Sequence, residues 1–366
     1  MNILHVATLT DSKTNGVCVI VPQHVEHQSE IENVRLVNIR NYQVAGDLQL
    51  EYKGSKTFPD YLEAPFNRPD LVIFHEVNNF EYIRLYKQLL KRKIPYVILP
   101  HGELTVKSLR KKFLKKKLAY LLFFNRFVKK SLGLQCLSEN EKGNIRFKVP
   151  KFVATNGVQI PEEKKSTFSE NGVKFIYVGR LEVDIKGLDL MIEGVAKNAG
   201  LFRNSGSTLD IYGPDILGRG RQVLDLIAAN CVQDIITMHP PVFGEDKKEV
   251  LLGGDIFIQT SRTEGMPLGI TEALAYGLPC LITEGTSIGG TVNGYGAGWV
   301  ATTDSDSVAR QIAEVFEQKE SFAEKSLNAR LAAEKEFGWD IIAAKAVEEY
   351  RALTSCEEKE RTNGEG

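Results

Sequence analysis

Short apolar runs alternate with amphipathic helical patterns along most of the chain. In the first half, the pattern predicts strands at residues 2–7, 34–39, 71–75, 96–100, 135–138 and 152–155, and helices at 17–29, 79–92, 107–130 and 139–147. A second series predicts strands at 174–179, 209–212, 235–238, 256–259 and 280–283, again with helices between them. Apolar strands that alternate with helices form parallel sheets, so the pattern is typical of an α/β protein.

A polar stretch without periodicity, residues 159–172, separates the two series and predicts an interdomain linker. The chain has 366 residues, which is more than one hydrophobic core usually supports. We therefore expect two doubly wound, Rossmann-like domains, at residues 1–158 and 172–337, that face each other across a cleft. The polar residues 355–366 predict a disordered tail.

Composition excludes several classes of protein. The five cysteines are scattered and lack any Cys-x-x-Cys spacing, which argues against a disulfide framework or a zinc site. The N-terminus enters a strand at once, and no apolar run reaches membrane-spanning length. These observations predict a cytoplasmic protein.

Positive charge is concentrated in the first half of the chain. Residues 1–150 hold 24 Lys and Arg against 14 Asp and Glu, whereas the remainder holds 22 against 33. Residues 107–130 carry ten basic residues and no acidic one, with Leu and Phe at helical spacing. Such a basic amphipathic helix predicts peripheral binding to an anionic membrane surface through Lys111, Lys112, Lys115 and Lys116. A solvated helix face is the alternative, and a nucleic-acid site is disfavoured because no reader motif is present.

Two carboxylates, Glu264 and Glu272, frame a predicted anion site. Seven residues separate them, and a helix is expected to begin near Pro267 or Leu268, because proline suits the first helical position. The free amides of residues 265–269 and the positive end of the helix dipole would bind a diphosphate. A carboxylate on either side suits a ligand with hydroxyls on both sides of a diphosphate, and a nucleotide sugar has that layout.

Three further positions lie at predicted strand ends. Arg180 and Lys186 follow the strand at 174–179 and would clamp a diphosphate, although either alone reads as a solvated surface cation. His101 follows the strand at 96–100, where it would donate a hydrogen bond to an oxygen that gains charge. Gly16, after the first strand, would let backbone approach a ligand.

Two motifs are interpreted as misleading. Asp304-Ser-Asp306 has the spacing of a metal-binding pair, but it precedes a helical pattern at 308–318 and is expected to cap that helix. The glycines at 296–301 match a dinucleotide-binding motif by letters only, because no strand precedes them and no helix follows. We therefore expect no metal and no other cofactor.

Taken together, these residues resemble glycosyltransferase family 4. The motifs are Glu264 and Glu272, Gly179-Arg180 with Lys186-Gly187, His101-Gly102, Asn156-Gly157-Val158 and Ile211-Tyr-Gly213. Family members are retaining, metal-independent enzymes of the GT-B fold with nucleotide-sugar donors. Residues 100–105, with the basic helix behind them, further resemble members that build bacterial capsular and surface polysaccharides.

The resemblance implies a role for each site residue. Glu272 would bind the ribose hydroxyls of a nucleotide sugar, expected to be a UDP-sugar, and Glu264 would bind the sugar hydroxyls with the amides of Gly265 and Met266. Arg180 and Lys186 would neutralise the departing diphosphate. His101 would hydrogen-bond the sugar or the departing phosphate. Pro267 and Leu268 complete the donor site.

The resemblance also extends to the two ends of the chain. It implies that a C-terminal helix at 339–353 crosses back onto the first domain, which would bind the acceptor. The chain departs from the family pattern at the segment Asn15-Gly16-Val17, which has one glycine where many members carry two.

Three function classes remain compatible with these residues. The first is a glycosyltransferase that uses a glycan or lipid-linked acceptor at the inner face of the cell membrane. A nucleotide-sugar epimerase of the same fold would bind the same donor without an acceptor. A non-catalytic partner subunit would keep the fold and lose site residues, whereas all those named above are present.

Overall fold

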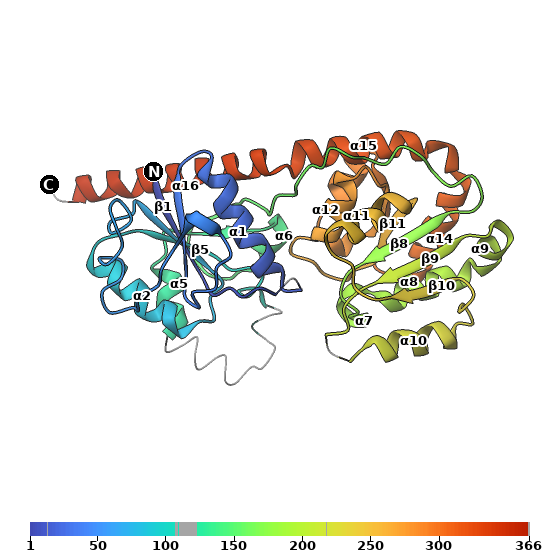
Figure 1. Ribbon diagram of the computed structural model, residues 1–366, viewed down its shortest axis with the longest axis horizontal. Helices are drawn as coiled ribbons and strands as arrows, with labels where there is room; N and C mark the ends of the chain where they lie inside the picture. Colours follow the sequence, from blue (N-terminus) through green and yellow to red (C-terminus); the bar gives the residue numbers. More distant parts are fainter. Residues whose placement is uncertain (13, 107–108, 110–122, 217, 365–366) are drawn as a thin grey trace. The chain divides into compact units, whose positions relative to one another are not determined.

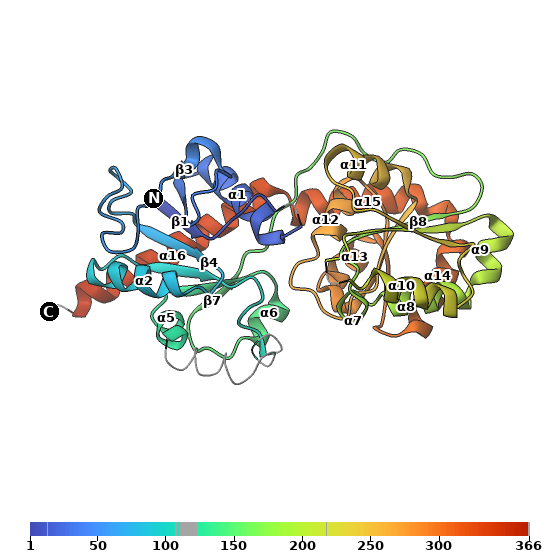
Figure 2. The same cartoon turned by 60° about the horizontal axis from the view of Figure 1, so that its bottom comes forward.

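The computed structural model describes residues 1–12, 14–106, 109, 123–216 and 218–364. The chain forms two compact units (Figures 1 and 2). Unit 1 combines Met1–Gly157 with Trp339–Gly366, and unit 2 is Val158–Gly338. Among the described residues, no helix has both the length and the apolar content that crossing a membrane requires.

Unit 1 contains a parallel sheet of seven strands in the order β3-β2-β1-β4-β5-β6-β7. The strands are β1 (Asn2–Ala7), β2 (Asn33–Asn38), β3 (Gln49–Leu50), β4 (Leu71–His75), β5 (Tyr96–Leu99), β6 (Gly133–Cys136) and β7 (Lys151–Val153). The six predicted strands are confirmed, with ends that move by at most two residues. The sequence does not reveal β3, because two residues are too few to show a periodic pattern.

Helices cover both faces of this sheet. They are α1 (Gly16–Ser29), α2 (Phe80–Lys91), α5 (Asn125–Lys129), α6 (Glu139–Asn144) and α16 (Trp339–Gly364). Successive side chains of a strand point to opposite faces, so Leu4 and Val6 pack in a core with Tyr86 of α2 and Phe127 of α5. His5, between them in sequence, meets α1 on the opposite face. Helix α16 packs beside α1.

Helix α16 belongs to unit 1, although it follows unit 2 in the chain. Its Trp339 indole donates to Gln23 of α1 at 3.1 Å, and Nε of Arg351 donates to Glu32 at 2.8 Å. The helix extends to Gly364, so the prediction of a disordered tail over 355–366 is wrong up to that residue. Glutamate, lysine and arginine dominate residues 357–361. These residue types favour helix, so they extend one that packing has already started.

Unit 2 contains a parallel sheet of six strands in the order β10-β9-β8-β11-β12-β13. The strands are β8 (Lys174–Val178), β9 (Thr208–Tyr212), β10 (Ile236–His239), β11 (Ile256–Gln259), β12 (Cys280–Thr283) and β13 (Gly298–Ala301). Five of them are confirmed predictions. The sixth, β13, occupies the stretch interpreted as a misleading glycine motif. Trp299 and Ala301 bury one side of this edge strand, but two apolar positions give too weak a signal to predict it.

Two layers of helices cover the unit 2 sheet (Figure 1). One layer holds α7 (Val183–Lys186), α8 (Leu188–Lys197), α9 (Ala199–Ser205), α10 (Gly220–Ala229) and α14 (Ser305–Glu317). The other holds α11 (Gly244–Gly253), α12 (Leu268–Ala275), α13 (Gly289–Tyr295) and α15 (Phe322–Glu336).

Each sheet has one point where the strand order reverses. In unit 1 the chain moves from β1 to β2 on one side, and β4 then lies on the other side of β1. In unit 2 the corresponding neighbours are β8 and β11. In open α/β sheets, ligands bind at the carboxyl ends of the strands at such switch points. These two places are therefore where a functional site is expected.

Candidate functional site

The switch point of unit 2 brings Lys186 and Glu264 together. Lys186 ends α7 after strand β8, and Glu264 lies in the loop after strand β11. Gly187, between α7 and α8, has a φ of +65°, and a Cβ at this position would lie 2.0 Å from the carbonyl oxygen of Thr260. Only glycine therefore allows this turn to pass so close to the end of β11.

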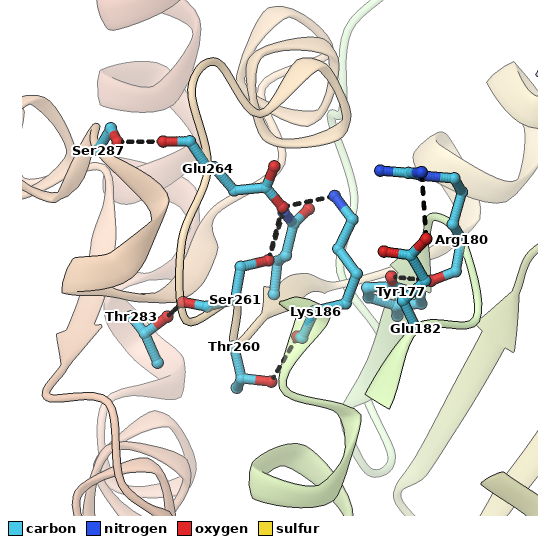
Figure 3. Close-up of polar contacts among 10 residues, drawn as sticks. Tyr177, Arg180, Glu182, Lys186, Thr260, Ser261, Glu264, Thr283 and Ser287 are labelled. Carbon is cyan, nitrogen blue, oxygen red and sulfur yellow. Dashed lines mark hydrogen bonds and ion pairs between the residues drawn. The ribbon is translucent and has the colours of Figure 1, made fainter. Parts of the chain in front are cut away.

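One oxygen of Glu264 is held by three donors (Figure 3). Its Oε1 accepts hydrogen bonds from Lys186 Nζ at 2.5 Å, Ser261 Oγ at 2.8 Å and Gln259 Nε2 at 3.2 Å. The Lys186 and Glu264 side chains are each 12% exposed. Among the described residues, nothing donates to Oε2 of Glu264. The carboxylate is thus fixed in orientation and retains one free acceptor.

The backbone around Glu264 is also fixed. Its amide donates to the carbonyl of Gly285 at 2.9 Å, and Ser287 Oγ donates to its carbonyl at 2.5 Å (Figure 3). Thr283 Oγ1 donates to the carbonyl of Ser261 at 2.7 Å. A Cβ at Gly285 would lie 2.3 Å from that same carbonyl oxygen, so this approach also needs glycine. The loop is therefore built to hold one conformation.

Free backbone amides follow Glu264 directly. Helix α12 begins at Leu268, within the predicted start near Pro267 or Leu268, and Pro267 is its N-cap and not its first helical residue. Within the described part of the chain, no group accepts a hydrogen bond from the amides of Gly265, Met266, Leu268 or Gly269. Several unpaired N–H groups at the positive end of a helix dipole favour an anion.

Glu272 lies one turn inside α12 and pairs with Lys247. The Lys247 ammonium of α11 is 2.5 Å from Glu272 Oε2, and the two side chains are 26% and 31% exposed. Sequence reasoning missed Lys247, because it belongs to a separate helix and no motif connects it to Glu272. The pair stays accessible to a ligand.

Arg180 extends from the end of β8 and is 47% exposed. Its Nη1 donates to Glu182 Oε1 at 3.2 Å, and its carbonyl accepts from the Tyr177 hydroxyl at 2.9 Å (Figure 3). The other oxygen of Glu182 is buried without a partner among the described residues. Arg180 therefore keeps guanidinium donors for a ligand.

The ion pair between Arg262 and Asp189 supports the loop before Glu264. Arg262 donates to both carboxylate oxygens of Asp189, at 2.8 and 2.6 Å. Burial by itself raises the pKa of Asp189, but the hydrogen bonds and charge of Arg262 outweigh it and hold that pKa below its ordinary value. Sequence reasoning missed this pair as well, because neither residue lies in a recognisable motif.

The other predicted site residues lie in unit 1. His101 follows β5 in a left-handed conformation with φ of +47°, and the next amide, of Gly102, donates to Glu141 Oε1 at 2.7 Å. Burial, with a smaller contribution from His24, lowers the pKa of His101 to about 3. Gly16 begins α1, and a Cβ there would meet no atom within 4 Å. Packing within unit 1 therefore does not require this glycine.

The remaining predictions concern metals and the membrane. Among the described residues, no group of three or more His, Cys, Asp or Glu is placed to hold a metal ion. Asp304 caps α14 by accepting from the Ser307 amide at 2.8 Å, so the capping interpretation is confirmed. The predicted membrane-binding residues Lys111, Lys112, Lys115 and Lys116 lie outside the described residues.

Comparisons with known proteins agree with this architecture. Residues 159–334 match the family model of glycosyl transferases group 1. No curated protein has a sequence that matches this chain.

Three of the similar solved structures are described here, and each match covers nearly all of both chains. A sucrose-phosphate synthase from Thermosynechococcus elongatus is 14% identical, with a TM-score of 0.73, over 97% of this chain and 100% of that one. HepE from Anabaena, in complex with UDP, is 16% identical, with a TM-score of 0.72, over 96% and 100%. WaaG, a glycosyltransferase involved in lipopolysaccharide biosynthesis, is 14% identical, with a TM-score of 0.63, over 94% and 98%.

The matches and the structure lead to the same fold assignment. The structure contributes the two parallel sheets, and the matches contribute known proteins with the same architecture. The predicted α/β GT-B fold, with two Rossmann-like domains, is confirmed. Residues 159–334 match the model of the group 1 glycosyl transferases, and the chain is a glycosyltransferase enzyme of the GT-B fold.

Proposed function

We propose that this enzyme is a retaining member of glycosyltransferase family 4 that transfers a sugar from a UDP-sugar. The observation that carries this proposal is the arrangement around α12. A fixed carboxylate with one free oxygen, Glu264, is followed by four unpaired amides and then by the accessible carboxylate of Glu272. This order suits sugar hydroxyls, a diphosphate and ribose hydroxyls in turn. HepE, which shares the fold, has been crystallised with UDP and with UDP-glucose.

In this proposal the diphosphate is neutralised without a metal. The unpaired amides of residues 265–269, here called the α12 amides, meet the diphosphate at one side. The exposed Arg180 guanidinium and the Lys186 ammonium supply positive charge. Lys186 also orients Glu264, so one cation would serve both the sugar and the phosphate. Gly16 of unit 1 is proposed as a further contact for the phosphate.

The proposed chemistry needs no covalent intermediate on the protein. The bond between the anomeric carbon and the phosphate oxygen breaks, and the acceptor oxygen bonds to that carbon on the same face of the sugar. The proton of the acceptor hydroxyl passes to the departing phosphate oxygen, so charge and atoms balance. The fixed donors of the site stabilise the negative charge that develops on that oxygen.

We further propose that unit 1 binds a glycan or lipid-linked acceptor for bacterial surface polysaccharide synthesis, at the inner face of the cell membrane. The excess of basic residues in 107–130 supports this assignment, since cations near an anionic lipid surface attract it. WaaG, which also shares the fold, acts in lipopolysaccharide biosynthesis.

The test compares two carboxylate variants by calorimetry with UDP and by turnover. Glu272→Ala removes hydrogen bonds to the ribose, each worth about 1.5–3 kcal/mol when one partner is charged, so the UDP affinity should fall about 10- to 150-fold or more. Glu264→Gln should lower turnover while leaving UDP affinity nearly unchanged. Glu324→Ala, an exposed carboxylate of α15, serves as control. Unchanged UDP affinity in Glu272→Ala would refute the ribose assignment.

A further inference from the structure

The carboxylate of Glu272 is held by one partner, the ammonium of Lys247. Lys247 Nζ lies 2.5 Å from Glu272 Oε2, and the two side chains are 26% and 31% exposed. Among the described residues, no other cation and no hydrogen-bond donor contacts either oxygen of Glu272. Glu264, in contrast, accepts from three side chains. The orientation of the Glu272 carboxylate is therefore set by Lys247.

Helices α11 and α12 bring this pair together from one layer of unit 2. Leu251 of α11 packs in the same core as Ile270 and Leu274 of α12, and both helices cover the same face of the sheet (Figure 1). Each helix follows a parallel strand, so both begin at the carboxyl edge of the sheet. Lys247 and Glu272 lie about one turn inside their helices. The ion pair is thus held at the edge where the α12 amides lie.

The stability of α11 gives little reason for a lysine at this position. A partly exposed ion pair contributes little to folding, because water solvates both charges well. The start of a helix also disfavours a cation, and the first turn of α11 carries the acidic Glu245 and Asp246 that the helix dipole favours. Lys247 is therefore better explained by its contact with Glu272 than by the helix that carries it.

The shape of a carboxylate indicates what this contact can do. Its two oxygens offer about four lone pairs, and Lys247 meets the group at Oε2. The remaining lone pairs can accept two hydroxyls that lie side by side, such as the 2′- and 3′-hydroxyls of a ribose. A carboxylate that rotates freely can meet one hydroxyl in several orientations, but it can meet both in only one. Fixing the carboxylate beforehand therefore strengthens the second hydrogen bond more than the first.

We propose that Lys247 fixes Glu272 so that both carboxylate oxygens face the ribose, and that the enzyme thereby selects ribonucleotides over 2′-deoxyribonucleotides. Lys247 is a positioning residue, because it acts through the carboxylate and not on the sugar. The proposal rests on the proposed function, in which Glu272 binds the ribose of the donor. Both residues lie in unit 2, so the selection is made within one unit.

The test measures the affinities of UDP and 2′-deoxy-UDP by calorimetry and uses their ratio. The wild type should prefer UDP about 10- to 150-fold, because the 2′-hydroxyl supplies one hydrogen bond to a charged acceptor. Lys247→Met keeps most of the side-chain length and removes the ammonium. It should lower this preference about 2- to 12-fold, which corresponds to ordering one flexible side chain. A preference equal to that of the wild type would overturn the proposal.

The ratio separates positioning from simple charge. Lys247 also offsets the negative charge of Glu272 near the diphosphate, so Lys247→Met should weaken the binding of both nucleotides. UDP and 2′-deoxy-UDP carry the same diphosphate, so this effect cancels in the ratio. A variant that weakens both nucleotides by the same factor would therefore leave Lys247 with a role in charge alone and would refute the positioning role.

Lys248→Met is the matched control. Lys248 is the next residue of α11, and its ammonium pairs with Glu163 and Glu245, at 2.5 and 3.2 Å. The substitution removes the same charge from the same helix, and it should leave the preference for UDP unchanged. An equal loss of preference in Lys247→Met and Lys248→Met would show that the effect comes from the overall charge of α11, which contradicts the proposal.

Glu272→Ala separates the role of Lys247 from the proposed function. Loss of the preference in Glu272→Ala, together with a partial loss in Lys247→Met, supports both. If Glu272→Ala loses the preference and Lys247→Met retains it in full, the ribose assignment stands and the positioning role fails. If Glu272→Ala keeps the wild-type preference, or the wild type has none, the ribose assignment fails and the role of Lys247 fails with it.

Discussion

His24 should make unit 1 sensitive to acid. The ring is buried in α1, with Nε2 3.0 Å from Asn156 Oδ1 and its edge against Trp339 at 4.9 Å between ring centres. Burial is the main cause that lowers its pKa to about 4. The contact with Asn156 opposes this shift, and the nearby His27 adds to it. In the unfolded chain the same ring titrates near its ordinary value of about 6.5.

The sign and size of the change in the free energy of unfolding follow from the linkage between proton binding and folding. Because the folded pKa is depressed, the unfolded state takes up the proton first. The stabilisation is complete above pH 6.5 and is lost as the pH falls toward 4. At pH 5.5 about nine-tenths of the unfolded molecules carry this proton and few folded ones do. The free energy of unfolding should therefore drop by about 1.4 kcal/mol through His24 alone.

The assay is urea unfolding of His24→Gln at pH 7.5 and at pH 5.5. Glutamine keeps a donor near the position of Nε2 but does not titrate. The substitution should therefore cost about 1.4 kcal/mol less at pH 5.5 than at pH 7.5. The chain has two tryptophans, so a Trp299→Phe background leaves Trp339, which touches His24, as a fluorescence reporter of unit 1.

A matched control separates titration from lost packing. Val25→Ala, at the next position of α1, removes buried apolar surface without a titrating group, so its cost should be the same at both pH values. Using the difference between variants also cancels other titrating groups, such as Glu76, whose pKa burial and the nearby Glu103 raise to about 7. An equal cost of His24→Gln at both pH values would show that burial does not hold His24 neutral.

Three further outcomes are expected. Transfer activity should survive excess EDTA, because Arg180, Lys186 and the α12 amides are proposed to replace a metal; loss in chelator with rescue by manganese would contradict this. Gly187→Ala should destabilise unit 2 by at least about 1–3 kcal/mol in thermal unfolding, since its Cβ would lie 2.0 Å from the Thr260 carbonyl at a φ of +65°; an unchanged melting temperature would refute the close approach. In co-sedimentation, the protein should bind anionic vesicles more than neutral ones and lose binding in high salt, whereas equal binding of wild type and a variant with four lysines changed to glutamine would remove the membrane proposal. Those lysines are Lys111, Lys112, Lys115 and Lys116.

Local patterns were sufficient to predict most of the fold. Buried parallel strands such as Leu71–His75 are continuous apolar runs, and the start of α12 is marked by Pro267. Both signals lie within a few neighbouring residues. Strands β3 and β13 were missed because one is two residues long and the other combines glycine with only two buried side chains.

The candidate site was predictable only where strand ends or motifs marked it. Glu264, Lys186 and Arg180 each follow a strand whose end the sequence indicates. Their partners depend on tertiary packing. Lys247 reaches Glu272 from another helix, and the direct bond between Lys186 and Glu264 joins residues 78 positions apart. No pattern in a single sequence indicates a contact between residues so far apart along the chain.

The histidines illustrate the same limit. His5 and His75 lie inside buried strands, where an isolated histidine usually signals core packing. Only the pairing of β1 with β4 aligns them with His101. The ring partner of His101 is thus a residue that sequence reasoning had no cause to select.

The discontinuous make-up of unit 1 has a consequence for biosynthesis. Unit 2 is one uninterrupted segment, Val158–Gly338, so it can fold as soon as it leaves the ribosome. Unit 1 must wait for α16, since Trp339 and Tyr350 are buried against residues made far earlier. Nascent chains stalled so that residue 338 has left the ribosome while α16 is still inside it should therefore hold a protease-resistant unit 2 beside a still-digestible N-terminal region. The part of the protein made first would be the last to become native.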